Sequence, residues 1–200
     1  VRDSKRNGVE DVFSRVKEIA KGAGIMAGVE AKINVQTGDY ELLVNQRGAQ
    51  ALQKNMDLLG PIVYTADEMA FAKKIQEVSN GQQIGMNGLI SPLKTTRENP
   101  DGGSTDVGDI SWLVPEITAL VTTAPANAPW HSWAVVACGG MSIGHKGMLF
   151  AAKSLSMTMV DLYESEQLRN DIRSEFDSRK GRHVYKGYIP DGPPPIPSGY

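Results

Sequence analysis

The sequence has a single cysteine, Cys138, so the chain cannot form an internal disulfide bond. It also opens without the basic and then apolar leader that is typical of a secreted protein. Both absences fit a reducing compartment, and we expect a cytoplasmic protein. The chain begins at Val1 without an initiator methionine, and Val1 and Arg2 are expected to be the tail of a strand in a fragment or truncated product.

An excess of charge of one sign is also missing. The formal net charge is -2, which does not predict binding to nucleic acid or to an anionic membrane surface. No apolar run is long enough to cross a bilayer, and no glycine-rich nucleotide fingerprint is present. A hydrophobic content of 40% in 200 residues instead predicts a globular chain with a sizeable core, in one domain or two small ones.

The first 60 residues alternate between helical and extended patterns. Residues 8–26 place apolar side chains at helical spacing, whereas residues 29–35 alternate apolar and polar positions as a half-buried strand does. A turn at 36–39 and a second strand at 40–44 complete a predicted hairpin. A further helix is stopped by Gly60-Pro61. This order predicts most of a small α+β sandwich.

The remaining residues predict a second block of mixed structure. Thr65 and Glu68 have capping-box spacing at the start of a helix that runs to about residue 80. Strands are expected at 117–123 and 132–138, followed by a long helix at 144–179. The Pro-rich tail from residue 189 is expected to be extended.

Three histidines are candidates for chemistry. His131 lies in a Pro-bounded bend between two tryptophans, where it suits metal binding or proton donation, or else a half-buried bond to a backbone carbonyl. His145 lies at a helix start and either bonds locally or points into a cleft. His183 lies in a basic segment and is interpreted as a solvated loop residue. A catalytic role for Cys138 is not favoured.

The stretch "GGSTDVGDISWLVP" at 102–115 has two compatible interpretations. As a helix start, its hydroxyls and carboxylates accept hydrogen bonds from free backbone N–H groups, and Asp109 suits the positive first turn. As a binding loop, its glycines allow close approach of the backbone, and its donors face an anionic ligand. The residues concerned are Ser104, Thr105 and Asp106.

At "STDVGDISWLVP", "PWHSW" and "GHKGM" the sequence resembles the aminobenzoyl-glutamate utilization B-type amidohydrolases, which belong to the superfamily of two-metal aminoacylases and glutamate carboxypeptidases. The resemblance covers nearly the whole chain. It implies that residues 1–62 are the end of a lid or dimerisation domain. Residues 63–200 would be the carboxy-terminal half of the catalytic domain. The implied fold class is α/β (α+β), a partial α+β sandwich followed by half of a mixed-sheet metallopeptidase domain.

The resemblance also implies a chemistry. Family members hydrolyse an amide bond beside a carboxylate-bearing group, using two metals, zinc or manganese, about 3.5–4 Å apart that activate a bridging water. His131 matches a metal-ligating histidine of the superfamily. Asp106 matches a position in an acidic loop that lines the cleft, and Asn45 matches a position that helps to hold the substrate. The candidate substrate-binding residues are thus Ser104, Thr105, Asp106, Asn45 and His145.

The family takes its general-base glutamate and its other metal ligands from an amino-terminal half that this sequence does not contain. We therefore expect a fragment of a hydrolase of acyl- or aminobenzoyl-glutamate-like amides, inactive alone, whose partners are a small amide or peptide substrate and the missing half. The alternative is a non-catalytic binding or oligomerisation module. In both cases the apolar helix at 144–163 needs cover, which predicts a homo-oligomer or a partner segment.

Overall fold

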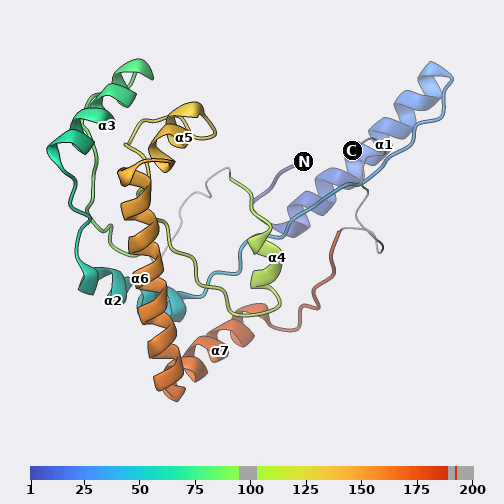
Figure 1. The fold of residues 1–200 in the computed structure, drawn as a ribbon. Coiled ribbons are helices and arrows are strands. Elements are labelled where there is room, and N and C mark those ends of the chain that lie inside the picture. The colour runs from blue at the N-terminus through green and yellow to red at the C-terminus, as the bar shows by residue number, and fades with distance from the viewer. Residues whose placement is uncertain (95–102, 189–191, 193–200) are drawn as a thin grey trace. The chain divides into compact units, whose positions relative to one another are not determined.

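The computed structural model describes residues 1–94, 103–188 and 192. Within these residues the chain forms helices and no β-strand (Figure 1). The predicted α/β class, with its α+β sandwich and its mixed sheet, is therefore wrong for the described chain. The helices are α1 (Arg6–Ala27), α2 (Gln46–Leu59), α3 (Ala66–Val78), α4 (Val107–Ser111), α5 (Trp133–Gly139), α6 (Ser142–Glu164) and α7 (Glu166–Lys180).

The chain divides into two compact units. Unit 1 comprises Val1–Val44, Arg97–Glu116 and Phe176–Tyr200, and unit 2 comprises Asn45–Thr96 and Ile117–Glu175. The predicted domain boundary between residues 62 and 63 stays a prediction. The Pro-rich tail lies outside the described residues except for Gly192.

In unit 1 the predicted hairpin is an extended segment that runs alongside α1 (Figure 1). Gly28 ends α1 in a left-handed conformation (φ 66°), and the N–H of Val29 then donates to the carbonyl of Gly24. A Cβ on Gly24 would lie 2.9 Å from the carbonyl oxygen of Val29, so glycine permits this close approach. Residues 29–35 alternate as a strand does, but no described segment pairs with their backbone groups as a ladder.

The second predicted strand of the hairpin is bonded by side chains of α4. The N–H of Tyr40 donates to Asp109 Oδ2 over 3.2 Å, and the N–H of Leu43 donates to Ser111 Oγ over 2.8 Å. The short helix therefore satisfies backbone groups that a neighbouring strand would otherwise bond. The alternation in the sequence correctly indicates extended backbone, but its bonding partner is different.

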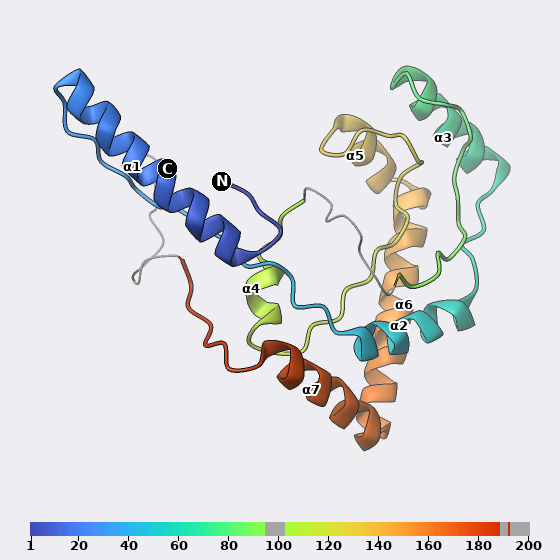
Figure 2. The same ribbon diagram turned by 180° about the vertical axis from the view of Figure 1, so that it is seen from behind.

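Unit 2 has a small apolar core between α3, α5 and the start of α6. The core side chains are Ala72, Ile75, Met86, Ala134, Cys138 and Ile143. Both α2 and α5 pack against α6, and Figure 2 shows α2 crossing that long helix. The predicted end of α2 at Gly60 is confirmed, and so is the capping box formed by Thr65 and Glu68.

The predicted strand at 132–138 is wrong, because these residues form α5. Ser132 caps the helix by accepting a hydrogen bond from the N–H of Ala134. The two fully buried side chains, Ala134 and Cys138, are four residues apart, which is the spacing of one helix face rather than of a strand. The segment 117–123, also predicted as a strand, has no strand pairing in the described chain.

The predicted helix at 144–179 is interrupted at Ser165. This residue has an extended backbone (φ -110°, ψ 100°), and its hydroxyl accepts from the N–H of Leu168 at the start of α7. In the described part of the chain no single helix has both the length and the apolar composition to cross a membrane. The pair α5 and α6, bent by 70° where the two helices meet, has this length and apolar composition when both are taken together. Core helices of soluble proteins also have this length and composition.

Candidate functional site

His131, the predicted metal ligand, lies on the bend that precedes α5. Its backbone is left-handed (φ 57°), a conformation that histidine adopts more readily than most residues. Its side chain is exposed, and the flanking indoles do not enclose it, since Trp130 is 74% exposed and Trp133 59% exposed. Within the described chain no hydrogen bond to the imidazole occurs, so both ring nitrogens are open to an incoming group.

A metal cage is not formed by the described residues. No group of three His, Cys, Asp or Glu side chains converges among them. A zinc site needs at least three protein ligands. The described donors therefore do not fit a complete zinc or manganese centre, and His131 suits at most the role of one ligand in it.

The loop before α4 has the features of a helix start. Ser104, Thr105 and Asp106 are exposed, and Thr105 Oγ1 accepts from the N–H of Val107 over 3.3 Å. Asp106 occupies the cap position without a side-chain cap bond. Within this motif the Asp109 carboxylate accepts from the N–H of Tyr40, as above, and from the hydroxyl of Tyr185. A substrate role for the three loop residues stays a prediction.

Asn45 has a structural role at the start of α2. It is buried, and its Oδ1 accepts from the N–H of Gly48 over 2.8 Å. Its Nδ2 donates to the carbonyl oxygen of Ile172 over 2.8 Å. The side chain therefore fixes the start of α2 against α7, and a substrate contact there stays a prediction.

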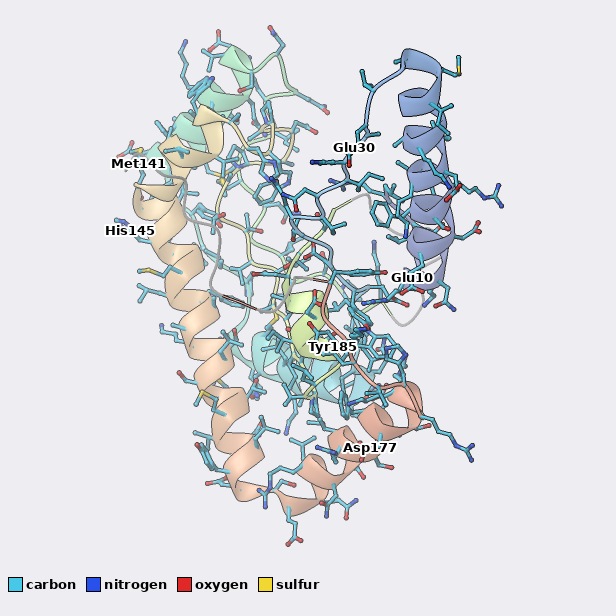
Figure 3. All side chains as sticks on the ribbon, turned by 90° about the vertical axis from the view of Figure 1, so that its right-hand side faces the viewer. Glu10, Glu30, Met141, His145, Asp177 and Tyr185 are labelled. Atoms are coloured by element: carbon cyan, nitrogen blue, oxygen red, sulfur yellow. The ribbon has the colours of Figure 1, made fainter. Side chains whose placement is uncertain are left out.

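The "GHKGM" motif lies in the first turns of α6. His145 is exposed and points away from the helix (Figure 3). A Cβ on Gly144 would overlap the carbonyl oxygen of Gly139, and one on Gly147 would lie 2.6 Å from that of Thr122. Both glycines are therefore required by close packing, which the sequence alone did not reveal.

The lysine of this motif is joined to the capping box of α3. Lys146 Nζ lies 2.5 Å from Glu68 Oε2 and also donates to the carbonyl oxygen of Val63. The hydrogen bond from Lys146, with further bonds from the Ser142 hydroxyl and the Thr65 N–H, lowers the pKa of the Glu68 carboxyl to about 2. The capping-box spacing predicted the bonds between Thr65 and Glu68. No local pattern predicts the bond of Glu68 to Lys146, which lies 78 residues away in the sequence.

Unit 1 contains an aromatic cluster around Tyr40. The rings of Trp112 and His183 lie edge to face with centroids 4.7 Å apart, and His183 Nε2 lies 3.3 Å from the Tyr40 hydroxyl oxygen. His183 is exposed and lies outside the helices, as predicted, but its ring contacts were not predicted. The Tyr185 hydroxyl donates to Asp109 Oδ1 over 2.8 Å, and this bond raises the pKa of that tyrosine.

The Arg6 guanidinium lies between two rings of the same cluster. It stands 3.8 Å from the ring centroid of Tyr40 and 3.6 Å from that of Tyr188. Burial, and then a hydrogen bond from its hydroxyl to Glu10, raise the pKa of Tyr188 to about 12. The phenol therefore stays neutral, and the cluster holds the segment 183–188 by stacking and hydrogen bonds.

A separate surface groove of about 480 Å³ lies on unit 2, formed by α2, α6 and α7. It contains none of the predicted site residues. Its walls carry charged side chains of both signs. The lining residues are Arg47, Gln50, Ala51, Lys54, Asp161, Glu164, Ser165, Leu168 and Asp171.

Comparison with known proteins confirms the resemblance that the sequence motifs indicated. The chain is 28% identical over 222 aligned positions to a p-aminobenzoyl-glutamate hydrolase subunit of Escherichia coli (strain K12). The alignment covers 98% of this chain and 46% of that protein, so the chain spans about half the length of the curated relative it matches. No family model matches the chain, and no solved structure matches it.

Proposed function

We propose that this chain is the carboxy-terminal part of a metal-dependent amidohydrolase that cleaves aminobenzoyl-glutamate-like or acyl-glutamate-like amides. The observation that carries the proposal is the alignment to a hydrolase subunit along 98% of the chain. Amide hydrolysis next to a glutamate carboxylate is the reaction class that the relative's name describes.

The contribution of this chain is one metal ligand, His131. Its imidazole is exposed and unbonded within the described residues, which leaves a ring nitrogen free for a divalent cation. A bound metal of this class supplies Lewis acidity and an activated water. Because the described residues hold no group of three ligands, the other ligands and the general base belong to segments outside them. The chain alone is therefore inactive.

The candidate substrate contacts are Ser104, Thr105, Asp106 and His145, whose side chains are exposed polar groups. Asn45 contributes indirectly, since both polar atoms of its side chain bond to protein. A protein partner is consistent with the relative, which is named a subunit.

The alternative function is a non-catalytic oligomerisation module. It is favoured by the exposed apolar side chains of α6, whose cover the described residues do not supply. They are Met148, Leu149, Leu155, Met159, Val160 and Tyr163.

A chimera separates the two functions. This chain replaces the matching 46% of the E. coli relative, and release of p-aminobenzoate from p-aminobenzoyl-glutamate is measured with zinc or manganese added. We expect the chimera to be active and its His131→Ala variant to lose at least about a hundredfold in kcat/KM, the upper end of the range for substitution of a residue that only supports a metal ligand.

The matched control is Lys153→Ala, which removes an exposed side chain of the same unit that has no assigned role in metal or substrate binding. This variant should retain metal binding and most of its kcat. An inactive chimera, or one that His131→Ala leaves unchanged, would favour the oligomerisation module. Stoichiometric zinc binding by the isolated chain would contradict the division of ligands proposed above.

A further inference from the structure

We propose that Gln76 is the positioning residue of the bend that carries His131. The inference deepens the proposed function, because it assigns to α3 the residue that fixes where the imidazole is presented. Nothing in the sequence around Gln76 singles it out, since a glutamine within a helix is ordinarily a solvated surface residue.

Gln76 is fully buried and makes three hydrogen bonds outside its own helix. Its Oε1 accepts from the N–H of Gly85 over 2.8 Å, and its Nε2 donates to the carbonyl oxygen of Gly85 over 3.3 Å. The same Nε2 donates to the carbonyl oxygen of Ala126 over 2.8 Å. One amide therefore joins α3 to the segment at Gly85 and to the bend.

The bend is fixed immediately after this contact. The N–H of Ala128 donates to the carbonyl oxygen of Pro125, which closes a turn whose third residue, Asn127, is left-handed (φ 66°). The side chain of Ala128 packs against the core of unit 2. The backbone that leads toward His131 is thus held by a turn, by the core and by the amide of Gln76.

The chain is fixed again immediately beyond His131. The Ser132 hydroxyl donates to the carbonyl oxygen of Pro129 over 2.6 Å and accepts from the N–H of Ala134, which is fully buried. Only Pro129, Trp130 and His131 lie between the two anchors. An exposed imidazole on so short a bridge keeps its place without partners of its own, as a preorganised ligand must.

The test observes His131 directly in the folded, metal-free chain. The protein has three histidines, so its imidazole Cε1–Hε1 NMR cross-peaks can be assigned with one variant each. Gln76→Met keeps the length and packing of the side chain and removes all three hydrogen bonds. We expect the His131 peak to shift or broaden, while those of His145 and His183 keep their positions.

The matched control is Asn55→Leu. Asn55 is another buried amide of unit 2, and it donates to Thr158 and Asp161 across the α2–α6 contact. Its loss should lower stability without moving the His131 peak. An unmoved peak in folded Gln76→Met, or an equal shift in Asn55→Leu, would overturn the proposal.

A second variant keeps the test decisive if Gln76→Met does not fold. Gln76→Glu retains the acceptor for the Gly85 N–H and removes the amide donor to Ala126, so the His131 peak should again move. Unfolding of both variants while Asn55→Leu folds would also contradict the proposal, because Gln76 would then serve the whole core. If the His131 peak moves in the Gln76 variant but the His131→Ala chimera stays active, the proposed function is overturned and the positioning role of Gln76 is not.

Discussion

Glu68 keeps its negative charge inside unit 2 because the groups that bond its carboxylate are all donors. It is 7% exposed, and its partners are the Lys146 ammonium, the Ser142 hydroxyl and the N–H of Thr65. Donors of this kind stabilise the ionised form more than burial opposes it. The cluster therefore ties the first turn of α3 to the first turns of α6.

The pKa of the Glu68 carboxyl is about 2, against an ordinary 4.5, so the stability of unit 2 depends on pH in the acid range. Because the folded value lies below the unfolded value, the contribution is complete above the unfolded pKa and is lost as the pH falls toward the folded pKa. We expect Glu68→Gln to lower the free energy of unfolding near neutral pH and the difference from wild type to shrink at about pH 3. Urea unfolding of the wild type and of Glu68→Gln, at neutral pH and at about pH 3, measures this difference in free energy. A difference that does not change with pH would contradict this account.

Removing the Lys146 ammonium alone should destabilise the protein more than removing both charges of its pair with Glu68. Lys146→Met leaves the Glu68 carboxylate buried without its strongest donor, which costs about 1–3 kcal/mol in unfolding free energy. Lys153→Met, an exposed lysine of the same helix, is the control and should change stability by less than about 0.5 kcal/mol. Equal effects of the two substitutions in urea unfolding would show that the Lys146–Glu68 pair does not stabilise the fold.

The first turns of α6 lie in close contact with neighbouring backbone. A Cβ on Gly147 would lie 2.6 Å from the carbonyl oxygen of Thr122, and backbone cannot rotate away as a side chain can. Gly147→Ala should therefore destabilise the protein by about 1–3 kcal/mol, the usual range for overpacking. The readout is the thermal unfolding midpoint followed by circular dichroism.

Gly139 provides the matched control for this substitution. It is a helical glycine of α5 with open space where a methyl group would stand, since no atom lies within 4 Å of an added Cβ. Gly139→Ala should be neutral or stabilising by up to about 1 kcal/mol, because alanine loses less backbone entropy in a helix. A destabilised Gly139→Ala and an unaffected Gly147→Ala would contradict the packing described for the two helices.

Helices were predicted well from the sequence where their ends carry local signals. Thr65 and Glu68 mark the start of α3 by their spacing, and Gly60 marks the end of α2, because caps depend on neighbours in the chain. Strands were predicted poorly, because alternation of apolar and polar residues indicates an extended backbone but not the segment that bonds to it. Residues 40–44 are extended, yet Asp109 and Ser111 of α4 bond them.

The candidate site was predictable only in part, for the same reason. His131 and the loop at Ser104 stand out by residue type and motif. Gln76 and Lys146 do not, since their partners are 50 and 78 residues away in the sequence. Short apolar runs are also ambiguous: the segment 132–138 suits a buried strand or a helix equally well until the burial of Ala134 and Cys138 is known.

At the scale of the whole molecule, a stripe on α6 predicts association. Met148, Leu155 and Met159 are exposed at helical spacing, and exposed apolar patches favour contact between copies. We expect sedimentation velocity to show self-association that increases with protein concentration and decreases in Leu155→Lys/Met159→Lys. Ser156→Lys, which adds charge without removing apolar surface, is the control. A chain that stays monomeric at all concentrations would contradict this prediction and weaken the oligomerisation alternative.

The thiol of Cys138 is fully enclosed in the core of unit 2, and burial raises its pKa. A thiol that is both shielded and protonated reacts slowly with maleimides and other alkylating reagents. The unmodified chain is therefore expected to react little with a thiol label during site-directed labelling. A cysteine introduced at Trp130 or Ser156 would carry a fluorophore or spin label alone, without replacement of the natural residue.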